Sequence, residues 1–202
     1  MTSIRLNTPI SNADVRKLGV KDTVYLSGIL VTARDQAHRR ALEYEKEGKT
    51  IPISLQGLAL YHCGPIVAEK SGERVVVAAG PTTSTRMDLF EDQFIQKFGV
   101  RVIVGKGGMG ERTVKACKEY GAVYCSFTGG AALLAKKGIK RVKGVEWLDL
   151  GMAEAMWIFE VENFGPIVVT IDSKGNSLHE QVAHDVRRNI QSIYQKLGLK
   201  SS

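Results

Sequence analysis

Apolar residues follow two different periods along this chain, and the two periods alternate. Short apolar, β-branched runs are each followed by a glycine-rich or polar loop and then by apolar residues at helical spacing. The expected strands are 24–32, 75–79, 100–104 and 122–127, and the expected helices are 34–46, 86–98, 112–120 and 131–137. The last three strand–loop–helix units follow one another without interruption. This order is typical of an α/β core with parallel strands.

Further segments surround these units. Short extended pieces are expected at 51–55, 58–62, 141–147, 156–162 and 167–171. A final helix carries an apolar stripe on one face: Leu178, Val182, Val186, Ile190, Ile193 and Leu197. We find no linker, repeat or low-complexity segment. We therefore predict one α/β domain over residues 1–202, with a mixed sheet and flanking helices.

Composition places the chain among ordinary globular proteins. Of its 202 residues, 44% are hydrophobic and 24% are charged. No apolar run reaches the roughly 18 to 20 residues that span a bilayer. The first five residues lack the charged-then-apolar layout of a signal peptide. We therefore expect a cytoplasmic protein that does not contact a membrane.

The net charge of +7 raises the question of nucleic-acid binding. The densest basic segment, 136–143, holds five basic residues in eight, and no continuous basic run exists. Motifs that read DNA or RNA are missing from the sequence. We expect no nucleic-acid partner. A small anionic substrate or an acidic protein partner explains the excess equally well.

The three cysteines, Cys63, Cys117 and Cys125, are separated by 54 and 8 residues. These gaps match no zinc or iron–sulfur spacing, and an odd number argues against a disulfide framework. Each is expected to be a small buried residue. We predict that this chain holds no metal by itself.

The segment from Gly80 to Met87 (GPTTSTRM) leaves an apolar run and enters a helical pattern through hydroxyl side chains. Free amides at a helix start, with Arg86 beside them, would form a receptor for a carboxylate or phosphate. An ordinary helix cap explains the same hydroxyls. Both interpretations remain open on this segment alone.

Loops that follow parallel strands meet at one edge of a sheet, where ligands bind. Four loops qualify here, and they carry Arg34 with His38, Thr82 and Thr83 with Arg86, Lys106 among the glycines 105, 107, 108 and 110, and the sequence Thr128-Gly129-Gly130. Two arginines, one lysine, hydroxyls and bare backbone suit a small dianion. The glycine loop lacks P-loop spacing. Arg34 could equally pair with Asp35 or Glu43, and His38 could equally be a satisfied core residue.

Seven motifs in one order carry a family resemblance: RDQAH (34–38), HCGP (62–65), GPTT with RM (80–87), GKGGM (105–109), GGAA (129–132), LGM (150–152) and FGP (164–166). Together they resemble the β subunit, or C-terminal domain, of the iron–sulfur (class I) fumarate hydratases and L(+)-tartrate dehydratases. The resemblance runs from about residue 4 to residue 180. It implies a swivelling β/β/α fold.

The resemblance also implies roles for the loop residues. Thr82 matches the general base that removes a proton from the carbon next to a carboxylate. Arg34, Arg86 and Lys106 match the substrate-carboxylate clamp, with Thr83, Gly105 and Gly107 as further substrate contacts. The cofactor, a [4Fe–4S] cluster with three cysteine ligands and one open iron, belongs to a partner α subunit in this family.

A threonine hydroxyl needs help to act as a base at neutral pH, because its pKa is far too high. Arg86 and Lys106 would stabilise the alkoxide, but an acceptor for the proton is also required. No carboxylate in these loops stands out. We therefore expect the acceptor to come from the partner subunit, and this chain alone to be inactive.

Three functions follow in order of preference. The first is the β subunit of a hydro-lyase that interconverts (S)-malate and fumarate plus water. The second is the β subunit of an L(+)-tartrate dehydratase giving oxaloacetate, in which Ser84 or Thr85 would read the additional substrate hydroxyl. The third is a dicarboxylate-binding module without catalysis.

Overall fold

The computed structural model describes residues 3–128 and 130–198. Nine strands form two sheets: β1 (Ser3–Asn7), β2 (Thr23–Thr32), β3 (Ala59–Tyr61), β4 (Ile66–Lys70), β5 (Glu73–Ala78), β6 (Val102–Gly105), β7 (Val123–Ser126), β8 (Ile139–Glu146) and β9 (Met156–Ile171). The helices are α1 (Asn12–Val15), α2 (Asp35–Lys46), α3 (Glu91–Phe98), α4 (Glu111–Tyr120), α5 (Ala132–Gly138) and α6 (Leu178–Lys196), with 3₁₀ helices η1 (Ser84–Leu89) and η2 (Leu148–Leu150).

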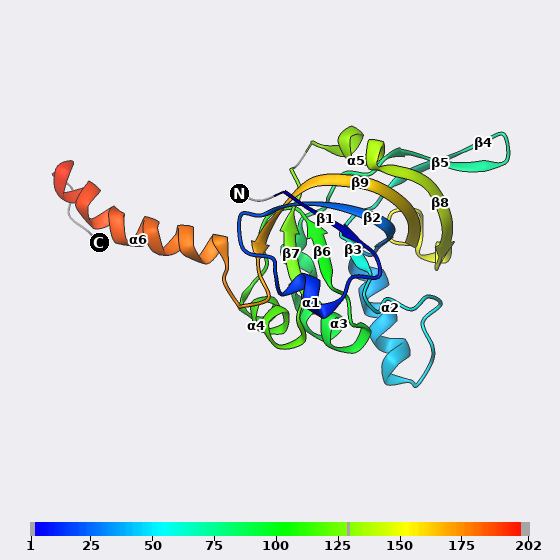
Figure 1. Ribbon diagram of the computed structural model, residues 1–202, viewed down its shortest axis with the longest axis horizontal. Helices are drawn as coiled ribbons and strands as arrows, with labels where there is room; N and C mark the ends of the chain where they lie inside the picture. The colour runs from blue at the N-terminus through cyan, green and yellow to red at the C-terminus, as the bar shows by residue number, and fades with distance from the viewer. Residues whose placement is uncertain (1–2, 129, 199–202) are drawn as a thin grey trace.

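Seven strands form one mixed sheet in the order β1-β2-β3-β6-β7-β9-β8 (Figure 1). Strands β1, β2, β3, β6 and β7 run parallel to one another, and β9 runs antiparallel to both β7 and β2. The additional β2–β9 pairing closes five strands into a barrel-like ring. The predicted α/β class with a mixed sheet is therefore confirmed.

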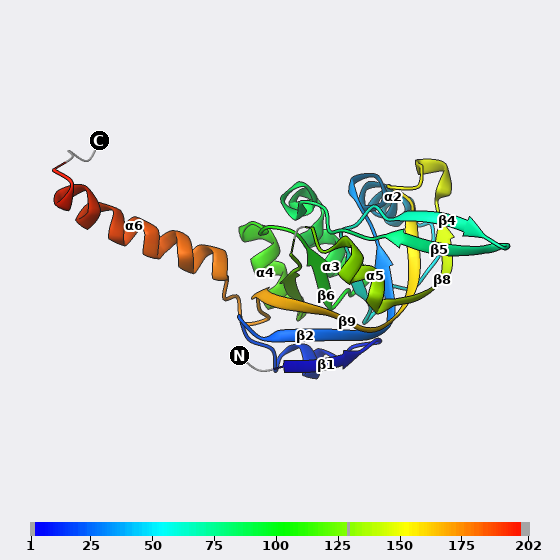
Figure 2. The ribbon, with the colours of Figure 1, turned by 90° about the horizontal axis from the view of Figure 1, so that it is seen from above.

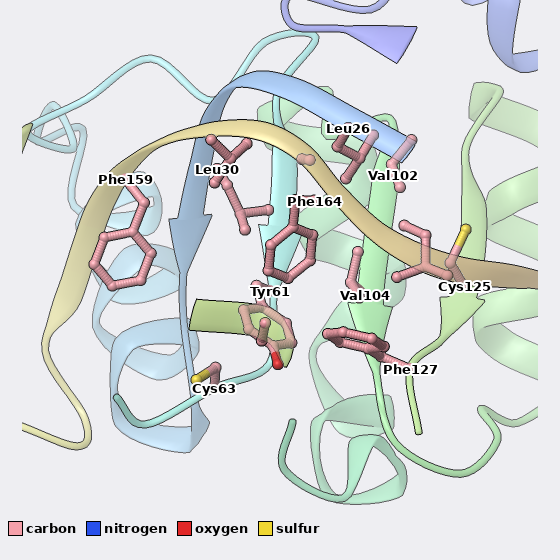
Figure 3. Packing of buried hydrophobic residues seen from close by; sticks show 14 of the residues in the cluster. Leu26, Leu30, Tyr61, Cys63, Val102, Val104, Cys125, Phe127, Phe159 and Phe164 are labelled. Carbon is pink, nitrogen blue, oxygen red and sulfur yellow. The ribbon is translucent and has the colours of Figure 1, made fainter. Parts of the chain in front are cut away.

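The interior of this ring is filled by alternate residues of its strands, as the period of two in a strand requires. Tyr61, Val104 and Cys125 point inward from β3, β6 and β7 toward Phe164 of β9 (Figure 3). The rings of Tyr61 and Phe164 meet edge to face, with centroids 5.2 Å apart. The hydroxyl of Tyr61 donates to the carbonyl of Ala79 at 2.7 Å, so this buried polar atom is satisfied.

The intervening residues of the same strands face outward and are covered by helices. Leu60, Ile103 and Tyr124 belong to a second buried cluster that includes apolar residues of α2, α3 and α4. These three helices lie on the same side of the sheet (Figure 2). The predicted burial of all three cysteines is confirmed: Cys63 and Cys125 lie in the ring's interior, and Cys117, a residue of α4, belongs to the second cluster.

The structure corrects the expected role of the run 75–79. It forms β5, but β5 pairs only with β4 in a two-stranded antiparallel hairpin that reaches away from the body (Figure 1). Val76 is buried, whereas Val77 is exposed. The place in the parallel sheet is taken by the short strand β3. A run of five apolar residues fits a buried strand and a half-covered hairpin equally, so periodicity could not separate them.

Two other expectations change. Residues 51–55 form no strand, and the pieces 156–162 and 167–171 belong to one 16-residue strand, β9. Glycine at position 165 allows this strand to approach β2 closely, because a Cβ there would lie 2.7 Å from the carbonyl oxygen of Val24. The FGP motif (164–166) therefore has a structural reason within β9.

Helix α6 matches its predicted bounds but packs little against the rest of the chain. It projects from the body in both views (Figures 1 and 2). Val182, Val186, Ile193 and Leu197 of its apolar stripe are 49% to 65% exposed. None of the helices in the described ranges is both long and apolar enough to cross a bilayer.

We predict that Phe164→Ala lowers the free energy of unfolding by about 3 to 5 kcal/mol, since it removes a fully buried phenyl group from the interior enclosed by the strands. The matched control is Val186→Ala on α6, which should change the free energy of unfolding by less than about 0.5 kcal/mol. Denaturant unfolding of the full chain measures both. Similar losses for the two variants would mean that α6 contributes to the same folded core.

Candidate active site

Three neighbouring parallel strands deliver their following residues to one edge of the sheet. β2 leads to Arg34, β3 leads to His62, and β6 leads to Lys106. The strands are adjacent in the order β2-β3-β6, so the loops that follow them lie side by side. The expected convergence is confirmed for the loops with Arg34 and Lys106. The loop with His62 lies between them and was not among the four expected, and the run before Gly80 is not a strand of this sheet.

The segment 82–84 reaches the same edge by pairing with the strand ends. The amide of Thr82 donates to the carbonyl of His62 at 2.7 Å. The amide of Lys106 donates to the carbonyl of Thr82 at 3.1 Å, and the amide of Ser84 donates to the carbonyl of Lys106 at 2.9 Å. The segment is therefore held like an extra piece of strand beside the Lys106 loop.

This pairing corrects both interpretations of the GPTTSTRM segment. The amides of Thr82 and Ser84 already have backbone partners, so neither is free to bind an anion. Thr83 precedes η1, but its side chain makes no capping hydrogen bond. The regular helix, α3, begins only at Glu91. This segment therefore offers no free helix N-terminus, and the groups it presents at this edge are side chains.

The two arginines are linked through α2. Arg86 Nη2 lies 2.7 Å from Asp35 Oδ2, and Asp35 is the first residue of α2. Arg34, the preceding residue, places its Nε 3.2 Å from Glu154 Oε1. Arg34 thus pairs with neither of the carboxylates suggested by the sequence, Asp35 and Glu43. Both guanidinium groups are brought to this edge, each with one carboxylate beside it.

Lys106, Gly107 and Thr83 are exposed, and Thr82 is partly exposed. Within the described ranges, Lys106 forms no ion pair, and the hydroxyls of Thr82 and Thr83 form no hydrogen bond. The site therefore presents an unpaired ammonium and unpaired hydroxyls on an open surface. Thr128 follows β7, whereas Gly129 of the fourth loop lies outside the described residues.

Gly105, predicted as a substrate contact, has a structural role in the fold. It is buried at the end of β6, and a Cβ built there would lie 1.8 Å from Ser84 Oγ and 3.1 Å from His62 Nδ1. The glycine therefore makes room for the Ser84 side chain. Ser84 itself is fully buried, so Thr85 is the exposed hydroxyl of the pair suggested to read the substrate.

A buried polar cluster lies directly behind this surface. His62 Nδ1 lies 2.9 Å from Ser84 Oγ, and His62 Nε2 lies 2.9 Å from Glu91 Oε2. His38 Nε2 lies 3.3 Å from the same Glu91 oxygen, and His38 Nδ1 lies 2.8 Å from the carbonyl of Arg34. All four side chains are fully buried. His38 is therefore a fully buried residue whose Nδ1 is hydrogen-bonded, whereas its Nε2 makes no hydrogen bond within the described ranges.

Burial and charge act in opposite directions on this cluster. Burial favours the neutral form of Glu91, but the two histidines outweigh it and lower the pKa of Glu91 to about 2. Burial also lowers the pKa of His62, against the attraction of the Glu91 carboxylate. The carboxylate is therefore ionised at neutral pH, inside the protein.

The atoms of His38, His62 and Glu91 that face one another lie within 4.8 Å, and this is the group within the described ranges that could ligate a metal ion. It supplies three ligands where a structural zinc site uses four. The cysteines do not join it, because they lie in two separate clusters of the core. Hydrogen bonds hold both nitrogens of His62 and the Nδ1 of His38 without an ion, whereas His38 Nε2 and Glu91 Oε1 have no hydrogen-bond partner within the described ranges.

In the sequence, His62 stands out only as part of the HCGP motif (62–65), and Glu91 does not stand out at all. Glu91 stands among other polar residues at the start of α3, and nothing in its spacing distinguishes it from a surface residue. Only the tertiary fold brings α2, β3 and α3 together behind the Thr82 segment. The cluster could not have been found from local patterns.

The chain matches the family model described as "Fumarase C-terminus" over residues 1–182 and belongs to this family. It is 43% identical over 173 residues to the "L(+)-tartrate dehydratase subunit beta" of Shigella sonnei, covering 86% of this chain and 85% of that protein. It is also 43% identical over 190 residues, 94% of both chains, to the "Putative L(+)-tartrate dehydratase subunit beta" of Methanocaldococcus jannaschii. These matches confirm the family resemblance.

A third relative is the "Putative fumarate hydratase class I" of Geobacillus stearothermophilus, which is 43% identical over 180 residues. The match covers 89% of this chain but only 34% of that protein. The names of the relatives thus include both a hydratase and dehydratases, which are hydro-lyases. They do not decide between the two substrates.

We predict that Gly105→Ala destabilises the chain by about 1 to 3 kcal/mol, because its methyl group would overlap the buried Ser84 hydroxyl. The matched control is Gly144→Ala in β8, where the nearest atom to a new Cβ is Ile158 Cδ1 at 3.5 Å, an ordinary contact. Neither glycine has a positive φ. Equal melting temperatures for the two variants would show that Ser84 can move aside without cost.

Proposed function

We propose that this chain is the β subunit of a two-subunit iron–sulfur hydro-lyase that interconverts (S)-malate and fumarate plus water. The proposal depends chiefly on one observation: in a member of this family, an unpaired Thr82 hydroxyl lies on the surface edge that also carries Lys106 and two arginines. Thr82 is proposed as the general base. Arg34, Arg86 and Lys106 are proposed as the carboxylate clamp, with Thr83 and Gly107 as further contacts.

The proposed chemistry removes a proton from the carbon next to a carboxylate and breaks the C–O bond of the adjacent carbon, forming the C=C double bond. The departing hydroxide and one proton, equivalent to the one removed, make up the water that is released. The arginines hold the two carboxylates of the substrate, since a guanidinium can donate two parallel hydrogen bonds to a carboxylate. Lys106 places a positive charge where negative charge develops on the threonine oxygen and the substrate. Asp35 and Glu154 orient the two arginines before substrate binds.

The iron–sulfur cofactor is proposed to belong to a partner α subunit, where the [4Fe–4S] centre would act as a Lewis acid on the substrate hydroxyl. The residues of this chain do not fit that group. Its three cysteines are buried, and Cys117 lies in a different core cluster from Cys63 and Cys125. We therefore derive no step of the reaction through residues of this chain bound to iron.

Two features support an assembly with another chain. The proposed site is open, and the Thr82 hydroxyl has no proton acceptor within the described ranges. The stripe on α6 leaves Val182, Val186, Ile193 and Leu197 exposed, and a contiguous apolar surface of this kind is typical of an interaction site. We also propose that the chain forms a single domain of the swivelling β/β/α fold and that it is located in the cytoplasm.

The L(+)-tartrate dehydratase activity is the second candidate, and the names of two relatives favour it. Thr85 is the exposed hydroxyl at the entrance to η1, and its Oγ1 donates to the carbonyl of Gly108 at 3.3 Å. A weak bond of this length could be exchanged for a substrate hydroxyl. A binding module without catalysis is the third candidate.

The test is to express this chain with its α subunit under anaerobic conditions and to assay the complex with (S)-malate, fumarate and both tartrate enantiomers. Turnover of malate and fumarate with the highest kcat/KM supports the first function. Preference for L(+)-tartrate establishes the second. Binding of dicarboxylates without turnover by the iron-loaded complex would establish the third.

Thr82→Val should lower kcat of the complex by several orders of magnitude with little change in substrate affinity. Valine keeps the branched shape and removes the hydroxyl, while the proposed clamp still holds the substrate. Thr83→Val is the control, because the neighbouring hydroxyl is equally unpaired and belongs to the same segment. Equal losses of kcat at both positions would contradict the assignment of Thr82 as the base.

Arg86→Lys should lower kcat/KM by about tenfold to a hundredfold, since the planar fork is lost although the charge remains. Arg112→Lys is a matched control on α4: its Nη2 lies 2.7 Å from Asp92 Oδ2, as Arg86 Nη2 does from Asp35 Oδ2. The two guanidinium groups also have similar exposure. If both variants keep the activity of the wild type, Arg86 has no part in the clamp.

A further inference from the structure

We infer that Ser84, His62, Glu91 and His38 form a buried positioning network that fixes the proposed base, Thr82, against Lys106. The inference rests on the proposed function, because it assigns these residues to the support of that site. None of the four touches the open surface, since all are fully buried. They are therefore positioning residues and not catalytic ones.

The network reaches the site through His62 in two ways. The carbonyl of His62 accepts the hydrogen bond from the Thr82 amide at 2.7 Å. Its imidazole meets the hydroxyl of Ser84, two residues further on, at 2.9 Å. One residue thus holds both ends of the segment 82–84. The segment is bonded in turn to the amide and carbonyl of Lys106.

The partners of the histidines determine where the protons lie. A carbonyl can only accept, so His38 Nδ1 must donate to the carbonyl of Arg34. The other nitrogen of His38 faces the Glu91 carboxylate, which also only accepts when ionised. This nitrogen lies 3.3 Å from Glu91 Oε2 and makes no hydrogen bond within the described ranges, so His38 is held in the network through its Nδ1 and by proximity to the carboxylate.

The same reasoning orients Ser84. One proton of the pair His62–Glu91 lies on His62 Nε2, because this nitrogen meets the ionised carboxylate at 2.9 Å. Neutral His62 then offers a lone pair at Nδ1, and the hydroxyl of Ser84 donates to it. Along the chain of hydrogen bonds from Ser84 through His62 to Glu91, each donor has one acceptor. The Ser84 rotamer is fixed by this bond and by the space that Gly105 leaves for it.

The surroundings keep this network rigid. The ring of Phe94 packs on His38 with centroids 4.5 Å apart, and Phe90 stacks on it at 6.2 Å. Loss of the hydrogen bond from His62 would leave the buried Glu91 carboxylate uncompensated, which is strongly unfavourable. The network therefore resists displacement, and so does the segment attached to it. A misplacement of about 1 Å at a catalytic group is enough to lower turnover markedly.

The experiment uses the complex with the α subunit. It separates the effect of the Ser84 hydrogen bond from the effect of the space that the Ser84 side chain fills. Ser84→Ala removes the bond and should lower kcat by about tenfold, with KM changed less than about threefold. In the double variant Ser84→Ala/Gly105→Ala, the new methyl group occupies the vacated space. We expect its melting temperature to exceed that of Gly105→Ala alone, while kcat stays at the low level of Ser84→Ala.

Val24→Ala is the control for general destabilisation, since Val24 is fully buried near the start of β2, at the opposite end of that strand from Arg34. It should lower the melting temperature and leave kcat unchanged. The inference is overturned if Ser84→Ala keeps the kcat of the wild type, or if the double variant recovers kcat together with stability. The first result removes any role in positioning, and the second reduces Ser84 to a space-filling group.

Two parallel measurements separate this inference from its premises. If Thr82→Val keeps kcat, the proposed function is wrong and the inference falls with it. If Thr82→Val abolishes kcat and Ser84→Ala does not lower it, only the inference is wrong. Elemental analysis of the purified full chain is the last arm. One equivalent of zinc, lost in a His62→Asn variant, would show that the cluster is a metal site and overturn the assignment of its protons.

Discussion

Backbone pairing between β2 and β9 is the interaction on which the rest of the structure depends. It joins Thr23–Val31 to Ile158–Val168 and closes five strands into a ring. Closure removes two sheet edges and creates an enclosed interior for Phe164 and its neighbours. The loops that carry Arg34, His62 and Lys106 meet at one edge because β2 pairs with β3 and β3 with β6, all in parallel.

The proposed site adds one element that does not come from a strand of this sheet. Segment 82–84 follows the hairpin β4–β5 and is attached to the strand ends by three backbone hydrogen bonds. Such a segment has no ladder of its own to hold it. The burial of Ser84 against Gly105 and its bond to His62 supply the missing constraint. The exposed hydroxyl of Thr82 is thus supported from behind by an apolar and ionic interior, and the surface in front of it stays open.

The fold class, the helices α2 and α6 and the strands β2, β6 and β7 could be predicted from the sequence because each has a clear period. The hairpin β4–β5 could not be distinguished from a buried strand, since Val75–Ala79 has the composition of both. The continuity of β9 was hidden by the FGP motif, which resembles a turn. The charged loop residues could be predicted because they stand at strand ends. Glu91 could not, because its burial depends on contacts between α2, β3 and α3.

The division of charge at this edge explains why a threonine could serve as a base only in an assembly. The cations of the surface, Arg34, Arg86 and Lys106, favour an alkoxide, but a field alone does not remove the proton. The buried carboxylate of Glu91 is committed to His62 and His38, and its pKa of about 2 makes it a poor proton acceptor. Asp35 and Glu154 are held by the two arginines. The acidic groups near the site are thus used for structure and orientation, so a proton acceptor for Thr82 has to approach from the open side, where a second chain would lie.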